Sequence, residues 1–256
     1  MILINKLNLI SYLEEKKIFI TNSKWSSNRI ENKTDLFKQI DNIVYFNKII
    51  GSYKENLMPR IKSNIFVEYE NYKKQIFILE RYARDLKKNN FNKLDQYIFK
   101  REKELIKLAN KALKVIDDSN SYKLILRSMR NYEVCLNRVD ENNLLVNYKG
   151  EILIGNIRYL SYNLKEHDIY SFIKRIKRKN INISVDEIIN YYIEKENLDE
   201  DSRSYIYGLS IYPNEEMRII EKHIRNKLLL NEEEAIEALY IAREVDFKLL
   251  DIRERE

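Results

Sequence analysis

The stretch Asn131–Leu160, NYEVCLNRVDENNLLVNYKGEILIGNIRYL, is the main β-rich region of a chain that otherwise shows helical spacing. Short runs of Val, Leu and Ile alternate here with Asn, Asp and Gly, which favour turns. The pattern predicts strand, tight loop, strand, turn and strand, over about residues 133–160. Cys135 lies in an apolar run, so we expect a buried small hydrophobe rather than a nucleophile.

The rest of the chain repeats apolar residues every three or four positions, which predicts helices. They are expected at 7–17, around 36–49 with a stop at Gly51, and at 66–88, 94–116, 122–129, 168–179, 185–195, 199–212, 215–228 and 232–252. A short strand is expected at 18–20, and Asp199, Asp201 and Asn231 are expected to cap helices. The fold class is therefore mostly α with a small β insert. The helices before the insert should pack as an antiparallel pair, with the later ones behind them.

Composition restricts the possible classes of protein. Hydrophobic residues make up 44% and charged residues 34%, which is typical of a globular chain. The net charge of +6 permits an anionic partner without requiring one. His167 and His223 lie far apart, so we predict no metal site. No apolar run reaches the roughly 18 residues of a membrane span, and the first residues lack a signal-peptide pattern, so we expect synthesis in a reducing cytoplasm and no membrane partner.

Four segments, in this order, resemble the CotS family of bacterial spore coat proteins, which share the fold of aminoglycoside and choline kinases. They are WSSNR at 25–29, IVYFNKIIGSY at 43–53, FNKLDQYIF at 91–99 and LSIYPNEEMRII at 209–220. Asn28 stands where the family has Gly, and Asn47 stands where it has His. The resemblance covers about residues 18–230 and implies a protein-kinase-like C-terminal lobe.

The resemblance also locates the positions of the family's catalytic loop. That loop reads His-Gly-Asp, four residues, Asn; its Asp accepts the substrate's hydroxyl proton and its Asn binds a metal ion. The matching residues are Leu136, Asn137, Arg138 and Asn143. A guanidinium has no acceptor, so Arg138 cannot take the proton. Asn143 is retained, and we expect it to hold the loop rather than a metal.

The family's second motif, Ile-Asp-Phe-Asp, falls on residues 155–158. Its first Asp holds Mg²⁺, but here that position is Asn156, and Arg158 replaces the second Asp. Two guanidinium groups beside such a site would repel the ion. Asp140 and Glu141 lie in the loop of the first motif, between Arg138 and Asn143, and we expect them to be solvent-exposed turn formers rather than substitutes.

The resemblance implies a division into residues 1–25, a remnant of the nucleotide-binding lobe with a short helix and strand, and residues 26–256, the C-terminal lobe with the β insert. The family's small lobe carries a Gly-rich loop and a strand Lys, and no Gly precedes Gly51 here. We therefore expect no nucleotide, no other cofactor and no catalysis. Asp168 is expected to cap the following helix and to tie it to the catalytic loop.

Loss of the small lobe would uncover the upper face of the large one. The structural hinge residue Trp25 lies there, Leu9, Ile10 and Leu13 would fill part of the gap and join the interaction surface, and Arg138 and Arg158 would form its rim. We expect this face to bind another spore coat protein or a second copy of the chain. The predicted protein is a catalytically inactive kinase-like component of coat assembly, made in the mother-cell cytoplasm and located in the spore coat.

Two alternative functions stay open. The first is an active phosphotransferase of the aminoglycoside or choline kinase type that uses unfamiliar residues. The second is a nucleic-acid-binding protein, based on five cations at positions 174–179 within FIKRIKRKN. Apolar Phe172, Ile173 and Ile176 predict instead an amphipathic helix with a solvated basic face, so we expect no nucleic-acid partner. The 19 tyrosines suit either coat cross-links or helix interfaces, and burial is the expectation that we favour.

Overall fold

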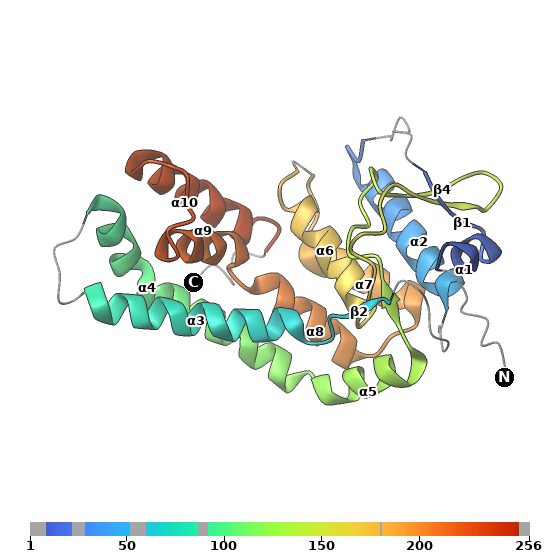
Figure 1. Cartoon of the computed structure of the whole chain (residues 1–256), viewed down its shortest axis with the longest axis horizontal. Coiled ribbons are helices and arrows are strands. Elements are labelled where there is room, and N and C mark those ends of the chain that lie inside the picture. Colours follow the sequence, from blue (N-terminus) through green and yellow to red (C-terminus); the bar gives the residue numbers. More distant parts are fainter. Residues whose placement is uncertain (1–8, 22–28, 52–59, 87–91, 180, 251–256) are drawn as a thin grey trace, which may run out of the picture.

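The computed structural model describes residues 9–21, 29–51, 60–86, 92–179 and 181–250 (Figure 1). Trp25 lies outside these described residues. The elements are α1 (Leu9–Glu15), β1 (Ile18–Ile20), α2 (Lys33–Ile50), β2 (Lys62–Ser63), α3 (Val67–Leu86), α4 (Lys93–Asp118), α5 (Ser121–Asn131), β3 (Val134–Cys135), β4 (Leu144–Val146), β5 (Ile152–Ile154), β6 (Ser161–Tyr162), α6 (Glu166–Ile176), α7 (Val185–Glu196), α8 (Glu200–Ile211), α9 (Asn214–Ile224) and α10 (Glu232–Phe247). The predicted class, mostly helical with a small β element, is confirmed.

The described strands form two small sheets. One has the order β1-β5-β4, with β1 parallel and β4 antiparallel to β5. The other has the order β2-β6-β3, with β2 parallel and β3 antiparallel to β6. Strand β2 lies between the helices expected around 36–49 and at 66–88, where the sequence predicted no strand. A two-residue strand shows no alternation in sequence, and its pairing with β6 depends on the tertiary fold.

Polar caps define where many of the helices begin. Side chains that accept the N–H of the third helical residue are those of Asn32, Asn92, Ser184, Asp199 and Asn231. Asp201 was also expected to be a cap, but it lies inside α8, because the cap at Asp199 starts that helix. Helix α6 begins at Glu166, slightly before the predicted start at Asp168.

Buried apolar side chains form two clusters. The first combines α1, α2, α7 and strands of the β element, and the second combines α3, α4, α9 and α10. Helices α6 and α8 contribute to both: Phe172 and Ile206 belong to the first cluster, Tyr170 and Leu209 to the second. In Figure 1 these two helices lie between the two groups. The chain therefore has two cores joined by shared helices.

Helices α3 and α4 lie side by side and run in opposite directions, as the predicted antiparallel pair requires (Figure 1). Helix α8 approaches α4 closely at Gly208. A Cβ atom there would lie 2.7 Å from Cγ1 of Ile116 and 3.0 Å from its backbone nitrogen. Glycine is thus what allows α8 to lie directly on α4. None of the helices that the structure describes is long and apolar enough to cross a membrane.

Helix α1 does not present the three apolar residues expected at an interaction surface. Leu9 and Leu13 are only 5% and 1% exposed and belong to the first core, while Ile10 is 47% exposed. The expectation was wrong for Leu9 and Leu13, because α1 packs against β1 and turns them inward. The division of the chain at residue 25 into two lobes stays a prediction.

Candidate functional site

The loop Leu136–Arg138 is held by a carboxylate from α6. Asp168 is fully buried; its Oδ2 accepts the N–H of Leu136 at 3.1 Å and its Oδ1 accepts the N–H of Asn137 at 2.6 Å. Asn137 has a left-handed φ of 60°, which these bonds help to maintain. Burial raises the pKa of Asp168 to about 7, although both N–H groups oppose the rise. Asp168 thus ties α6 to the loop, but it does not cap α6, because it lies within the helix.

The side chain of Asn137 fastens the loop to the segment that leads into β6. Its Nδ2 donates to the carbonyl of Tyr159 at 2.8 Å and to Oγ of Ser161 at 2.8 Å. Nearby, Cys135 is buried as expected, and burial raises the pKa of its thiol well above the usual value. A protonated, buried thiol is a poor nucleophile, so the apolar interpretation of Cys135 holds.

Asn143 joins the two segments that the resemblance matched to the catalytic and metal-binding motifs. Its Nδ2 donates to the carbonyl of Arg138 at 2.6 Å and to the carbonyl of Asn156 at 3.2 Å. The side chain of Asn156 turns back on its own segment, where Oδ1 accepts the N–H of Arg158 at 2.7 Å. Residues 136–143 and 155–158 therefore lie side by side, as catalytic and metal-binding segments would. Asn143 acts on the backbone of the loop, in line with the role expected for it.

Asp140 and Glu141 are not the exposed turn formers that the sequence predicted. Asp140 is 2% exposed; its Oδ2 accepts from Nε of Arg138 at 3.3 Å and forms an ion pair with Nε of Arg175 at 3.2 Å. The Glu141 side chain is 11% exposed and pairs with Lys179 at 2.5 Å. The prediction was wrong because basic residues of α6 and of the turn after it lie over this loop and cover its carboxylates.

The basic run at 174–179 is solvated in part: the side chains of Arg175 and Arg178 are 44% and 53% exposed, whereas Lys177 is buried. Its members are engaged within the chain: Lys174 with Glu68, Arg175 with Asp140, Arg178 with Glu215, Lys179 with Glu141, and Lys177 with the carbonyls of Ser210 and Asp246. Helix α6 ends at Ile176, so the last three cations follow the helix rather than continue it. The cations serve as links between α6 and its neighbours.

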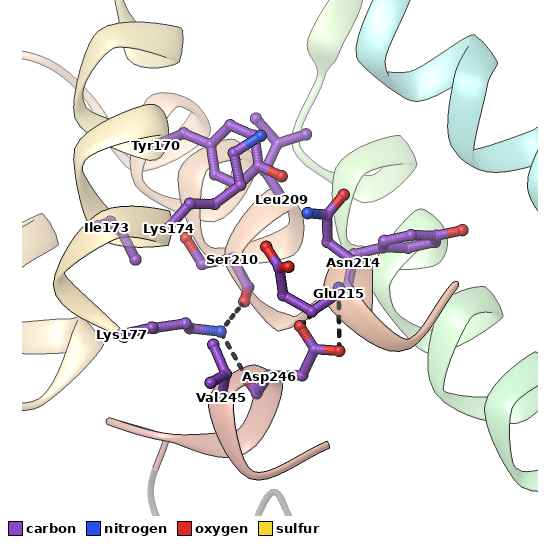
Figure 2. Close-up of a pocket in the computed structure, with 11 residues that line it drawn as sticks. Tyr170, Ile173, Lys174, Lys177, Leu209, Ser210, Asn214, Glu215, Val245 and Asp246 are labelled. Atoms are coloured by element: carbon purple, nitrogen blue, oxygen red, sulfur yellow. Dashed lines mark hydrogen bonds between the residues drawn. The ribbon is translucent and has the colours of Figure 1, made fainter. Parts of the chain in front are cut away.

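Figure 2 shows the surroundings of Lys177, where α6 meets α8, α9 and α10. Lys177 is buried, and its Nζ donates to the carbonyls of Ser210 and Asp246 at 2.7 Å each. The Asp246 carboxylate accepts the N–H groups of Glu215 and Glu216, so it caps α9 from another helix. The cavity here is only about 10 Å³, which is room for about one water molecule. These contacts hold α6, α8, α9 and α10 together, and the cavity is too small for an organic ligand.

A larger pocket of about 470 Å³ lies beside the loop Leu136–Arg138. Side chains from the β2–α3 segment, the loop, the β5–β6 connection and α6 surround it, including Lys62, Glu68, Asn137, Arg158, Tyr170 and Lys174. His167 also lines it; burial lowers the pKa of this imidazole to about 4, and its Nε2 lies 3.1 Å from the Tyr205 hydroxyl. His167 is therefore neutral at pH 7.

Sequence reasoning located part of this pocket and missed the rest. Asn137 and Arg158 were named through the motifs. Lys62 and Glu68 carry no motif: Lys62 precedes the helix expected at 66–88, and Glu68 lies near its start. No group of three or more His, Cys, Asp or Glu side chains arranged to hold a metal ion occurs among the described residues. His223 lies apart, with its Nε2 3.0 Å from Oδ1 of Asp95.

The fold that surrounds this pocket is that of the aminoglycoside phosphotransferases. The crystal structure of an aminoglycoside phosphotransferase from Alicyclobacillus acidocaldarius matches with a TM-score of 0.62 and 12% identity, over 89% of this chain and 67% of that chain. A spectinomycin phosphotransferase, solved with ADP and spectinomycin, gives a TM-score of 0.49 and 15% identity, over 90% of this chain and 69% of that one. No family model and no curated protein matches the sequence. At such identities the likeness is one of fold.

Proposed function

We propose that this chain is a catalytically inactive protein built on the phosphotransferase fold, with a binding or structural role. One observation carries the proposal: the two segments matched to the catalytic and metal-binding motifs lie side by side, while the positions matched to the reactive Asp residues hold Arg138 and Asn156. Asp168 supports the loop, and Asn143 joins the two segments. A guanidinium cannot accept a proton, and a neutral amide is a weaker ligand for Mg²⁺ than a carboxylate.

The neighbouring carboxylates do not replace the missing ones. Asp140 is the nearest in sequence to the proton-accepting position, but two guanidinium groups hold its carboxylate. These two contacts commit the Asp140 carboxylate to holding the loop against α6. Asp168 is committed to two backbone N–H groups. Each acidic group near the loop thus has a structural partner, which supports inactivity over the alternative of an active phosphotransferase.

The expected result with nucleotide is an absence of stabilisation. Adding millimolar MgATP to the protein should leave its melting temperature unchanged, because a ligand raises that temperature only if it binds the folded state. The measurement is a thermal shift assay, with ATP plus EDTA as the control for effects of the nucleotide alone. A reproducible, Mg²⁺-dependent rise of several degrees would contradict the proposal. In that case loss of the rise in Asp140→Asn would identify the substituting carboxylate.

The pairing of the basic run supports the absence of a nucleic-acid partner. Nucleic acid binding depends on cations that are free to neutralise phosphates. The five cations at 174–179 already have partners inside the chain, and Lys177 is buried. Breaking these links to bind a phosphate backbone would cost the contacts that hold α6 in place. This observation favours the protein-binding function over the nucleic-acid one.

We also propose that the chain is a component of the bacterial spore coat, where it contacts other coat proteins or a second copy of itself. The support is the ordered set of segments that resemble the CotS family, together with the phosphotransferase fold. The expected result is that mass spectrometry of purified spores from the organism that encodes the chain detects it in the coat fraction. Its presence only in the mother-cell lysate, with known coat proteins recovered as a control, would contradict this location.

A further inference from the structure

The 470 Å³ pocket beside the loop Leu136–Arg138 has the charge and size of a site for an anion. Its volume falls in the range of about 300–1,000 Å³ that is typical of small-molecule pockets. We propose that it binds a small organic phosphate, with Lys62 and Arg158 holding the phosphate group. This inference deepens the proposed function and rests on it, since it assigns a ligand to a site that no longer performs transfer.

The charge balance of the pocket is the first argument. Three cations line it, Lys62, Arg158 and Lys174, against one carboxylate, Glu68. Glu68 is already satisfied: its Oε1 pairs with Lys174 Nζ at 3.0 Å and accepts from the Tyr72 hydroxyl at 3.2 Å. Burial raises the pKa of Glu68, but Lys174 outweighs this effect and the net pKa is lowered. Both side chains of the pair are therefore charged, and their opposite charges cancel.

The remaining two cations have no such partner. Neither Lys62 nor Arg158 forms an ion pair with any acidic side chain in the described part of the chain. Arg158 lies with its guanidinium 5.9 Å from the centre of the Tyr159 ring, and the carbonyl of Tyr159 is held by Asn137. This contact places Arg158 at the pocket without using its five donors. Two unbalanced cations match a phosphate monoester, which carries about −1.5 to −2 charges at pH 7.

The surrounding groups suit an organic ligand rather than a free ion alone. Arg recognises phosphate through two parallel hydrogen bonds, which Lys62 can complement as a point charge. Asn64 and Tyr159 also line the pocket, and these residue types carry an amide and an aromatic ring that suit the organic part of such a ligand. His167 is neutral and adds no charge, so the positive character comes from the two named cations.

The test uses isothermal titration calorimetry on the full chain, with EDTA present and no nucleotide. The probe is glucose 6-phosphate; glucose, inorganic phosphate and malate are the comparison ligands. We expect saturable binding of the ester and none of glucose. Arg158→Gln and Lys62→Gln should each weaken binding by about tenfold or more, which corresponds to the loss of one charge-assisted contact of about 1.5–3 kcal/mol. Both side chains are exposed, so both variants should keep the melting temperature of the parent.

Lys149→Gln is the matched control. Lys149 lies on the same β insert with its ammonium 5.7 Å from the centre of the Tyr148 ring, much as Arg158 lies on Tyr159, but it does not line the pocket. Its replacement removes the same charge and should leave binding unchanged. Equal weakening by Lys149→Gln and Arg158→Gln would overturn the proposal, because attraction would then be non-specific. The proposal would also be overturned if the ester did not bind, or if malate or inorganic phosphate bound as tightly as the ester.

Failure of this site and failure of the proposed function give different results. Phosphoryl transfer is assayed separately, by ADP release from MgATP. Turnover of MgATP would contradict the inactive assignment, whatever the calorimetry in EDTA shows. If the ester does not bind in EDTA and MgATP is not turned over, the proposal of an inactive protein is unaffected. Only the proposal that the pocket binds a phosphate ester is then overturned.

Discussion

Replacing Arg127 by Met is expected to lower the free energy of unfolding by about 3–5 kcal/mol. Nη2 of Arg127 lies 2.7 Å from Oε2 of Glu166, and its Nε lies 2.9 Å from Oε1 of Glu133. The Glu166 side chain is 0% exposed. Burial raises the pKa of Glu166, but Arg127 outweighs this effect and the net pKa is lowered. Without Arg127 the carboxylate stays buried and loses the cation that keeps it ionised.

The loss is measured by urea denaturation followed by circular dichroism. Lys114→Met is the control, because it breaks the exposed pair of Lys114 and Asp118 on α4, and it should produce no measurable change. Adding Glu166→Gln to Arg127→Met should recover part of the stability, since the second change removes the unpaired charge. If Arg127→Met proves no more harmful than Lys114→Met, the pair does not support the fold as we describe.

The second large effect is expected at Asp168. Asp168→Ala should lower the free energy of unfolding by roughly 2–6 kcal/mol, because two N–H groups each lose their acceptor at about 1–3 kcal/mol. Asp168→Asn keeps one carbonyl oxygen and should lose about half as much. The change also frees Asn137 from the bonds that help to hold its left-handed backbone, so the loop beside the pocket should loosen.

Two measurements separate a loosened loop from general destabilisation. Urea denaturation gives the overall loss, with Asp118→Ala as a matched Asp→Ala change at the exposed end of α4. Amide hydrogen exchange then reports the protection of Leu136 and Asn137 in the folded protein. We expect protection to fall at both amides in Asp168→Ala and to be unchanged in Asp118→Ala. Unchanged protection at Leu136 in Asp168→Ala would show that another group holds the loop.

Much of the secondary structure was predictable because its signals are local. Apolar residues on helical spacing mark each long helix, and Asp199 and Asn231 mark two helix starts by their own hydrogen-bonding chemistry. The β insert was visible in the alternation of β-prone runs with turn formers. The chemical character of Arg138 and Asn156 also belongs to the sequence alone, because a residue type keeps its donors and acceptors in any fold. These residues are the basis of the inactive assignment.

Contacts between distant segments decided which residues are buried and which side chains line the pocket. In the sequence Asp140 has the character of a surface turn residue, but in the fold α6 lies over it and Arg175 pairs with it. Leu9 and Leu13 become core residues only because α1 packs on β1. The pocket of about 470 Å³ joins Lys62 of β2, Arg158 of the β5–β6 connection and Lys174 of α6. The hydrophobic periodicity of the sequence does not predict such contacts, because burial and charge balance depend on which elements pack together. The sequence by itself therefore determined which side chains stand at the positions matched to the catalytic motifs, and the tertiary structure decided which cations line one pocket, because that depends on how distant segments pack.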